Sequence, residues 1–251
     1  MKIVITGATA GIGRALAQHY ARPGNTLGLL GRRAAQLETL TTACVAQGAT
    51  VAAAALDVRD ESAMQAYAEA FITQAQGVDL VIANAGLSQP DHLASGQAAT
   101  HSALFATNVI GVLNTLLPFI PQMIRQRQGQ LVAIASVAGF RALPSSTTYA
   151  ATKIAVRTLM EGYGWALRQH GIVTTTINPG FVVSEMTAGN QFYMPFLLPT
   201  DIAARKIARA IQRRRRRYTF PWPMALAAHL LPCVPGALLG RLEPRQKPPG
   251  T

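Results

Sequence analysis

The chain has 251 residues, of which 49% are hydrophobic, so it is long enough to bury a sizeable core and suits one large α/β domain. Its formal net charge is +12, but the basic residues are not interleaved with aromatic residues and no zinc-finger spacing occurs, which argues against nucleic acid as a partner. Cys44 and Cys233 lie far apart without metal-ligand or redox spacing, so we expect inert thiols and no metal site.

The amino-terminal stretch predicts a strand, a glycine turn and a helix. The apolar run at residues 2–6 is followed by Gly7, Gly11 and Gly13 and then by a helical pattern at residues 14–21. A tight glycine turn before a helix lets backbone amides approach a pyrophosphate, which favours dinucleotide binding over a plain turn. Because the strand begins at the second or third residue, no room remains for a cleavable signal peptide, and we expect the catalytic part to be cytoplasmic.

The second apolar run, residues 26–30, ends in Gly31-Arg32-Arg33. In a dinucleotide-binding fold, a carboxylate about 20 residues past the glycines holds the ribose 2′-hydroxyl of NAD, whereas an arginine there accommodates the 2′-phosphate of NADP. No acid lies near this position, so Arg32 and Arg33 favour NADP(H) over NAD(H). The alternative is that the two arginines only open the next helix, residues 34–47, where cations gain nothing from the helix dipole.

Strands and helices alternate through the rest of the chain. Further strands are expected at residues 51–56, 78–83, 130–135 and 172–177. Further helices are expected at residues 61–76, at 101–128 with a bend at Pro118 and Pro121, and from Ser145 or Ser146 to Gly171. This alternation predicts an α/β fold with a doubly wound, mainly parallel sheet, the Rossmann fold, in a single domain.

Small or polar residues follow the carboxyl ends of the later strands, where ligands bind in open α/β sheets. These residues are Asp57-Val58, Asn84-Ala85-Gly86, Ser136 and Asn178-Pro179-Gly180. We therefore expect a binding site along one edge of the sheet.

A tyrosine and a lysine lie four residues apart on the helix after Ser136. At this spacing Tyr149 and Lys153 project from one face, one turn apart. A phenol has a pKa of about 10, and a neighbouring ammonium lowers it by favouring the phenolate. The pair is therefore a candidate acid/base, and its alternative is an exposed lysine whose stem lies beside a half-buried tyrosine.

In their order and type, these motifs resemble the short-chain dehydrogenase/reductase family over residues 2–215. The matching residues are Thr6-Gly7-Ala8-Thr9-Ala10-Gly11-Ile12-Gly13, Asp57, Asn84-Ala85-Gly86, Asn108, Ser136, Tyr149 with Lys153, and Pro179-Gly180 followed by Ser184. The resemblance implies a catalytic tetrad of Asn108, Ser136, Tyr149 and Lys153. It implies that Tyr149 is the general acid/base and that Ser136 hydrogen-bonds the substrate oxygen. Lys153 would lower the Tyr149 pKa and hold the nicotinamide ribose, and Asn108 would hold a water.

The same resemblance implies the cofactor-binding residues. Asp57 and Val58 are similar to adenine contacts, and Pro179 and Gly180, with Ile177, would bracket the nicotinamide. The expected set is Gly7, Thr9, Gly11, Ile12, Gly13, Arg32, Arg33, Asp57, Val58, Asn84, Ala85, Gly86, Tyr149, Lys153, Pro179, Gly180, Val182 and Ser184. Ala10 departs from the basic residue that many NADP-using members carry, which leaves the selectivity to the two arginines.

These resemblances imply an NADP(H)-dependent oxidoreductase that interconverts a ketone or aldehyde and an alcohol. Family members are commonly dimers or tetramers, so we expect a homo-oligomer. The alternative function is a catalytically idle NADP(H)-binding scaffold or sensor at a membrane.

Apolar bulk concentrates in residues 181–200, where this family places its substrate lid. The residues concerned are Met186, Phe192, Tyr193, Met194, Phe196, Leu197 and Leu198. This composition favours a lipophilic ketone or alcohol as substrate. The alternative is that the side chains pack a lid helix or an oligomer interface.

The chain does not match the many soluble members of this family that close the sheet with a seventh strand ending in paired glycines. The dinucleotide-binding and catalytic domain is expected at residues 1–217 and an apolar, proline-rich tail at residues 218–251. The simplest interpretation of the arginine run at residues 213–217 is that it forms the solvated end of a helix.

Two arrangements of the tail remain open. In the first, a short helix at residues 224–231 lies in a lipid interface, and residues 213–240 make peripheral contact with an anionic membrane. Four prolines between residues 221 and 235 argue against a spanning helix. In the second, residues 218–220 form a terminal strand and the rest folds over the substrate cleft or a partner subunit.

Overall fold

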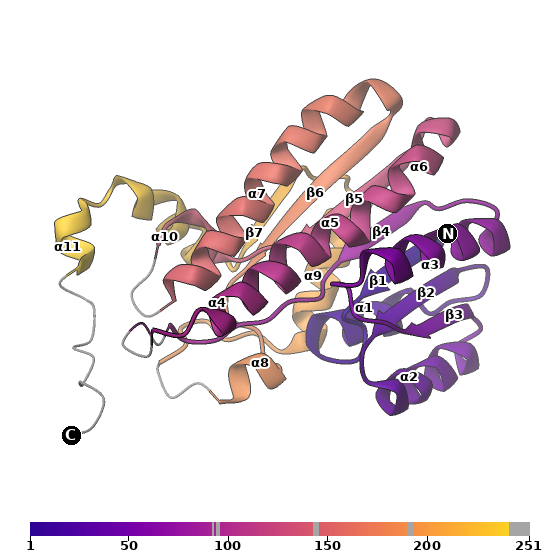
Figure 1. Cartoon of the computed structure of the whole chain (residues 1–251), viewed down its shortest axis with the longest axis horizontal. Helices are drawn as coiled ribbons and strands as arrows, with labels where there is room; N and C mark the ends of the chain where they lie inside the picture. The colour runs from indigo at the N-terminus through magenta and orange to yellow at the C-terminus, as the bar shows by residue number, and fades with distance from the viewer. Residues whose placement is uncertain (92, 94–95, 143–145, 190–192, 241–251) are drawn as a thin grey trace.

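The computed structural model describes residues 1–91, 93, 96–142, 146–189 and 193–240, and its centre is a seven-stranded sheet (Figure 1). The strands are β1 Lys2–Thr6, β2 Thr26–Gly31, β3 Thr50–Ala55, β4 Leu80–Ala83, β5 Gly129–Ile134, β6 Ile172–Pro179 and β7 Arg217–Phe220. Their order is β3-β2-β1-β4-β5-β6-β7 and every neighbouring pair is parallel. The predicted doubly wound parallel sheet is confirmed, and the strand order reverses between β1 and β4.

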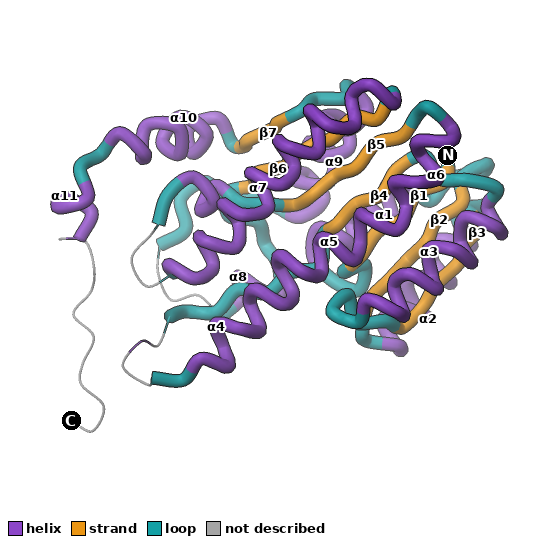
Figure 2. The backbone as a smooth tube through the Cα atoms, turned by 45° about the horizontal axis from the view of Figure 1, so that its top comes forward, coloured by secondary structure: helices purple, strands orange, loops and turns teal. Residues whose placement is uncertain are grey.

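Helices cover both faces of the sheet, as Figure 2 shows. One face packs on α1 Gly11–Tyr20, α2 Ala34–Ala46 and α9 Thr200–Gln212, and the other on α3 Glu61–Ala75, α5 Gly111–Leu116, α6 Ile120–Gln126 and α7 Thr147–Leu167. The sheet has a hydrophobic core on each face. In β1, Ile3 and Ile5 belong to the core under α1, α2 and α9, whereas Val4 belongs to the core on the opposite face. Because successive side chains of a strand point to opposite faces, a nearly continuous apolar run is what a strand buried on both sides requires.

The predicted helix at residues 101–128 is interrupted more often than expected. It begins as α4 Ala98–Phe105, passes through a π-helical turn, η2 Ala106–Ile110, and continues as α5. A 3-10 turn, Leu117–Phe119, then leads into α6, which agrees with the interruption expected from Pro118 and Pro121. The whole run, Ala98–Gln126, is long and apolar enough to cross a membrane, but half of its most apolar part packs inside the protein.

The sheet continues beyond residue 217, because residues 217–220 pair with β6 as a parallel edge strand. The alternative in which residues 218–220 form a terminal strand is therefore the one that the structure contains. α10 Trp222–Leu230 follows at the carboxyl end of β7, and α11 Gly236–Gly240 lies farther out (Figures 1 and 2). Residues 241–251 of the predicted tail lie outside the described residues.

The arginine run and α10 lie at opposite ends of β7. Residues 213–216 precede this four-residue strand, which spans about 13 Å at the usual rise. Arg214 donates through Nη2 to the carbonyl of Gly129 at 3.1 Å, and Arg217 pairs with Glu161 at 2.9 Å. The arginines therefore mark the amino-terminal edge of the sheet, away from the edge where the expected site lies.

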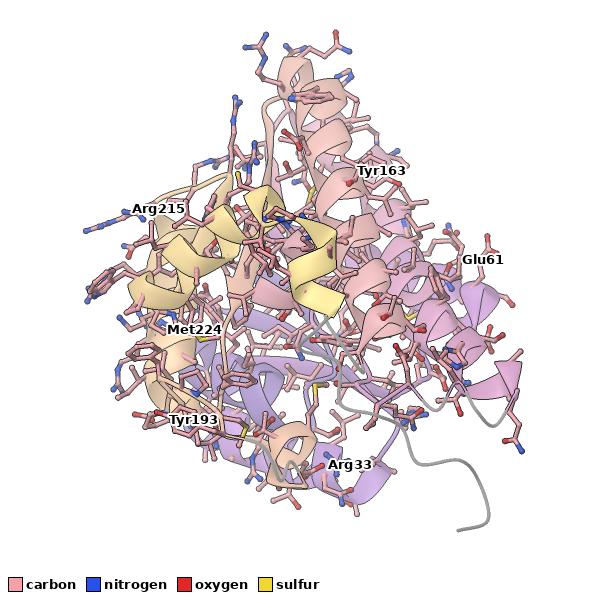
Figure 3. The ribbon with its side chains drawn as sticks, turned by 90° about the vertical axis from the view of Figure 1, so that its left-hand side faces the viewer. Arg33, Glu61, Tyr163, Tyr193, Arg215 and Met224 are labelled. Carbon is pink, nitrogen blue, oxygen red and sulfur yellow. The ribbon has the colours of Figure 1, made fainter. Side chains whose placement is uncertain are left out.

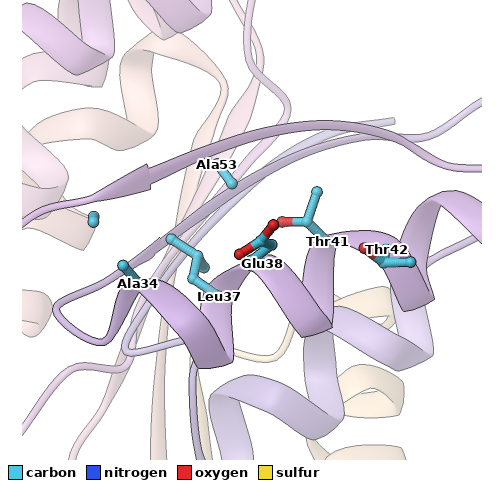
Figure 4. A pocket seen from close by; sticks show the side chains of 7 residues that line it. Ala34, Leu37, Glu38, Thr41, Thr42 and Ala53 are labelled. Atoms are coloured by element: carbon cyan, nitrogen blue, oxygen red, sulfur yellow. The ribbon is translucent and has the colours of Figure 1, made fainter.

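A shallow pocket lies between α2 and β3 (Figure 4). It is lined by Ala34, Leu37, Glu38, Thr41, Thr42, Ala53 and Ala55. None of these residues belongs to the expected catalytic or cofactor-binding set.

Candidate active site

The glycine turn between β1 and α1 forms a close-packed cradle. Gly7 has a φ of 64°, in the left-handed region that favours glycine. A Cβ on Gly13 would lie 2.3 Å from the carbonyl oxygen of Gly7, so no side chain fits there. Ala10, the residue before α1, provides no side-chain cap, which leaves amides at this helix end for an anionic ligand. Gly7, Thr9, Gly11, Ile12 and Gly13 thus fit a pyrophosphate.

Asn84, which follows β4, holds this turn from the neighbouring strand. Its Nδ2 donates to the carbonyl oxygens of Thr6 at 3.0 Å and Gly7 at 3.2 Å. The Thr6 hydroxyl accepts from the backbone amides of Asn84 at 3.2 Å and Ala85 at 3.4 Å. Asn84 and Ala85 therefore shape the cradle by hydrogen bonding. This supporting role of Thr6 was not predicted, although the residue lies in the glycine motif.

The two arginines after β2 differ in their surroundings. Arg33 donates to the carbonyl of Thr9 at 3.2 Å and to Glu185 at 2.8 Å, so it links the glycine turn to the short helix α8 Glu185–Ala188. The Arg32 side chain is 59% exposed and lies 3.7 Å from a carboxylate oxygen of Asp57. Arg32 is therefore the more available of the two, a distinction that the adjacent sequence positions did not reveal.

Asp57 and Val58 follow β3 at the same edge of the sheet. Arg59, which was not predicted, contacts the Asp57 carboxylate at 2.6 Å. Hydrogen bonding from Arg59, with a smaller contribution from Arg32, lowers the pKa of Asp57. Val58 is buried, and its carbonyl accepts from Asn114 at 2.9 Å. The carboxylate of Asp57 is thus held between Arg59 and Arg32, and Val58 is held by Asn114.

The four expected catalytic residues come together beyond the ends of β4 and β5. Asn108 lies in the π turn, where its Oδ1 accepts from the Leu87 amide at 2.7 Å and its Nδ2 donates to Thr152 at 3.1 Å. π turns often occur at functional sites. A Cβ on Gly86 would lie 3.2 Å from Oδ1 of Asn108 and 3.5 Å from Nζ of Lys153, so this glycine sits between the two polar groups.

Ser136 and Tyr149 face each other from β5 and α7. Ser136 begins the 3-10 turn η4 Val137–Phe140 and accepts the amide of Ala138 at 3.1 Å. Its hydroxyl is hydrogen-bonded to Tyr149, which lowers the phenol pKa, but burial has the larger effect and raises it. The structure therefore differs from the expectation that the Tyr149 pKa is lowered, because loss of hydration outweighs the favourable contacts. A protonated phenol can donate its proton to an oxygen on which negative charge develops, but a raised pKa makes it a weaker acid than the tuned pair that the sequence predicts.

Lys153 is buried and oriented by the backbone. Its side chain leaves the residue 5% exposed, and Nζ donates to the carbonyl of Ile134 at 3.0 Å, 5.6 Å from the centre of the Tyr149 ring. Burial lowers its pKa to about 8. The lysine therefore lies one turn from the tyrosine, as the helical spacing predicts, with its ammonium anchored at the end of β5.

The segment after β6 lies against the glycine turn. Pro179 ends β6, Val182 is buried, and a Cβ on Gly11 would lie 3.2 Å from Cβ of Ser184. Gly180 donates its amide to the carbonyl of Phe220 at 2.7 Å. Val182 also forms a parallel β-bridge with Leu198, so the two ends of the expected lid, residues 181–200, lie side by side. Phe192, Ser145 and the remainder of residues 190–192 and 143–145 lie outside the described residues.

The C-terminal helix contacts the catalytic edge, which sequence reasoning left as one of two arrangements. The Phe140 ring, four residues after Ser136, packs on the Arg157 guanidinium at 3.5 Å and on the His229 ring at 4.8 Å. Met224 of α10 packs on Gly180, and it lies on the same side of the molecule as Tyr193 of the lid segment (Figure 3). α10 therefore borders both the serine turn and the segment after β6.

Comparisons with known proteins agree with this architecture. The family model for short chain dehydrogenases matches residues 1–192. An uncharacterized oxidoreductase of Myxococcus xanthus is 37% identical over 235 residues, covering 94% of this chain and 93% of the relative.

Two solved structures are similar over nearly the whole chain. A short chain dehydrogenase/reductase of Burkholderia phymatum in complex with NAD is 26% identical, with a TM-score of 0.84 over 100% of this chain and 98% of the other. A short-chain dehydrogenase of Sphingobium yanoikuyae in complex with NADPH is 26% identical, with a TM-score of 0.82 over 98% and 96%. From its motifs, fold and relatives, the chain belongs to the short-chain dehydrogenase/reductase family of oxidoreductases.

Proposed function

We propose that this oxidoreductase uses NADP(H) to interconvert a ketone or aldehyde with an alcohol on a lipophilic substrate. The observation that carries the proposal is the partly buried Tyr149 phenol, hydrogen-bonded to Ser136 and one helical turn from Lys153. The three side chains converge at the edge of the sheet where the glycine cradle also lies. This arrangement suits acid/base chemistry on a carbonyl beside a dinucleotide.

The proposed mechanism divides the reaction among the chain's own residues. The glycine cradle, Arg32 and Lys153 would hold the dinucleotide, which supplies the hydride when bound. Tyr149 donates its proton to the carbonyl oxygen as negative charge grows there, while the Ser136 hydroxyl donates a hydrogen bond to the same oxygen. Asn108 holds the backbone of Leu87 and the side chain of Thr152, and so fixes the shape of the site around Lys153.

Preference for NADP(H) is proposed from the charge at the end of β2. Arg32 is exposed, and in the described part of the chain its charged partner is the carboxylate of Asp57 at 3.7 Å, which Arg59 holds more closely at 2.6 Å. An arginine here suits the 2′-phosphate, as a carboxylate would suit the free 2′-hydroxyl. Of the two solved structures described above, one is named with NAD and the other with NADPH. The proposed preference for NADP(H) therefore rests on Arg32.

Steady-state reduction of a panel of hydrophobic ketones tests the reaction and the cofactor preference together. We expect the parent to consume NADPH faster than NADH, and Arg32→Asp to lower kcat/KM for NADPH by about 10-fold or more while sparing NADH, as loss of a charged hydrogen bond would. Arg125→Asp makes the same charge change on α6 and serves as the control. Equal preference in the parent and in Arg32→Asp would overturn the assignment to NADP(H).

The alternative function, a catalytically idle NADP(H)-binding scaffold or sensor at a membrane, makes a different prediction for the same assay. A scaffold binds NADPH in a fluorescence titration but consumes none with any ketone. The convergence of Ser136, Tyr149 and Lys153 favours turnover.

The lipophilic substrate is proposed from the lid segment. Met186, Tyr193, Phe196 and Leu197 are exposed on the segment that begins beside the catalytic edge. Exposed apolar side chains beside a catalytic site suit an apolar ligand. Short and long aliphatic ketones in the panel test this: an equal kcat/KM for both would contradict it.

Two exposed apolar surfaces support further proposals about assembly and location. Phe105, Ile110 and Leu117 are exposed on the α4–α6 run, Ile154 is exposed on α7, and these side chains suit a homo-oligomer interface. On α10, Trp222, Leu226 and Leu230 recur every four residues, and Trp222 is 77% exposed. This second stripe suits peripheral contact of a cytoplasmic enzyme with a membrane through α10, whereas the arginines at residues 213–216 lie at the other end of β7.

Two sedimentation experiments test the proposed oligomer surface and the proposed membrane surface independently. Without lipid, sedimentation velocity should show a dimer or tetramer, and a monomer at micromolar concentration would contradict the oligomer. With phosphatidylcholine vesicles that contain phosphatidylserine, the parent should cosediment and Trp222→Ser should remain in solution. Trp165→Ser is the matched control, because Trp165 on α7 is also an exposed tryptophan and belongs to neither surface. Equal binding by all three proteins would exclude α10 as the contact.

A further inference from the structure

Asp91 is a buried carboxylate outside the expected catalytic set. Its side chain is 2% exposed and lies in the connection between β4 and α4. The carboxylate accepts the backbone amide of Thr148 at 3.1 Å through Oδ2 and at 3.4 Å through Oδ1. A carboxylate withdrawn from water is unfavourable unless it is hydrogen-bonded or paired, so this contact explains how the group is tolerated.

This contact caps the helix that carries the tyrosine and the lysine. α7 begins at Thr147, and the preceding Ser146 provides no side-chain cap. Asp91 therefore supplies the missing acceptor from another part of the chain, 57 residues away. Its negative charge also lies at the positive end of the helix dipole, which is the favourable arrangement.

His101 of α4 holds the same residue by its side chain. Its Nδ1 lies 2.6 Å from the hydroxyl of Thr148 and 3.8 Å from Oδ1 of Asp91. Thr148 is thus hydrogen-bonded through its backbone amide to Asp91 and through its hydroxyl to His101. Tyr149 is the next residue along the helix.

The helical run that begins with α4 contacts α7 a second time, one turn farther along α7. There Asn108 donates to the hydroxyl of Thr152 at 3.1 Å, and the next residue is Lys153. Each of the two acid/base residues is therefore preceded by a threonine that is hydrogen-bonded to the α4–η2 run. The connection after β4 is held at both places as well, through Asp91 at Thr148 and through Leu87 at Asn108.

We propose that Asp91 and His101 are positioning residues, which fix the first turn of α7 and thereby the place of the Tyr149 phenol. The proposal rests on the proposed function, because it assigns them a role in proton transfer by Tyr149. Neither touches the reacting atoms. A shift of the helix start displaces the phenol directly, and a misplacement of about 1 Å can lower turnover by about 100-fold.

Asp91→Ala tests the proposal against a matched loss of a helix cap. Asp60 also caps a helix by its carboxylate, accepting the amide of Ala63 at 2.9 Å from the exposed N-cap position of α3, and α3 carries none of the catalytic residues. We expect Asp91→Ala to lower kcat by about 10- to 100-fold with unchanged NADPH affinity, and Asp60→Ala to leave kcat unchanged. Asp91→Asn keeps an acceptor oxygen and should recover most of the turnover. His101→Leu should give a smaller decrease, because the backbone contact of Asp91 remains.

A spectroscopic measurement makes the test independent of turnover. With carbon-13 at Cζ of the tyrosines, the Tyr149 resonance is identified by its loss in Tyr149→Phe. It should move in Asp91→Ala and stay in Asp60→Ala, even if the parent reduces no ketone and the proposed function fails. If Asp91→Ala does not fold, Asp91→Ser, with a shorter acceptor, replaces it. A Tyr149 resonance and a kcat no more altered than in Asp60→Ala would overturn the positioning role.

Discussion

Tyr149→Phe should lower kcat for ketone reduction by about 100- to 10,000-fold, the usual contribution of a positioned general acid. The substitution removes the phenol proton that the proposed mechanism transfers to the carbonyl oxygen, while the ring stays in place. Affinity for NADPH should be unchanged, because the glycine cradle and Arg32 lie on other elements. Folding should lose about 0.5–1.5 kcal/mol with the hydrogen bond to Ser136.

Tyr163→Phe is the matched control for this result. Tyr163 lies farther along α7, and burial raises its pKa too. It is remote from Ser136 in the sequence and is not among the residues at the catalytic edge, so its loss should leave kcat unchanged. Steady-state rates and NADPH titration on the three proteins decide the point, and a Tyr149→Phe enzyme with parent-like turnover would falsify the proposed mechanism.

Gly13→Ala should weaken NADPH binding, because the added Cβ has no room. It would lie 2.3 Å from the carbonyl oxygen of Gly7 and 2.4 Å from Nδ2 of Asn84. The first is backbone, and the second already bonds the backbone of Thr6 and Gly7, so the turn itself must move. Since this turn shapes the cradle, we expect NADPH affinity to fall by about 10-fold or more, alongside an overpacking loss of about 1–3 kcal/mol in stability.

Gly162→Ala provides the control for a glycine-to-alanine change. Gly162 lies in α7 with open space where its Cβ would be, so alanine should leave NADPH binding unchanged and stabilise the helix by about 0.5–1 kcal/mol. Fluorescence titration measures the affinity and thermal unfolding the stability. Parent-like NADPH affinity in Gly13→Ala would mean that the glycine turn is not the pyrophosphate site.

The pattern of apolar and polar residues along the chain was sufficient to predict most of the strands and helices. The apolar runs of β1 and β2, closed by Gly7 and Arg32, have the length and flanks of strands buried on both faces, and they form where predicted. The spacing of Tyr149 and Lys153 on one helix is also a local property, since four residues make about one turn. These predictions need only the period of each element and the ends of the strands.

Contacts between distant segments were not accessible in this way. Arg33 and Glu185 are 152 residues apart, and nothing near either one predicts their contact. The π turn around Asn108 joins α4 to α5 and packs on α7, and apolar periodicity does not distinguish it from an ordinary helical turn. The raised pKa of Tyr149 has the same origin, because burial depends on everything packed around the phenol.

The sequence by itself determined the parallel α/β fold, the glycine turn and the residue types of the catalytic edge, because strand and helix periods and strand ends are written in neighbouring residues. Only the tertiary structure decided that Arg32 is more available than Arg33, that residues 217–220 extend the sheet, and that α10 borders Phe140 and Gly180. The same holds for Asp91 at the start of α7. Such partners are set by how whole elements pack, and side-chain burial and pairing follow from that packing.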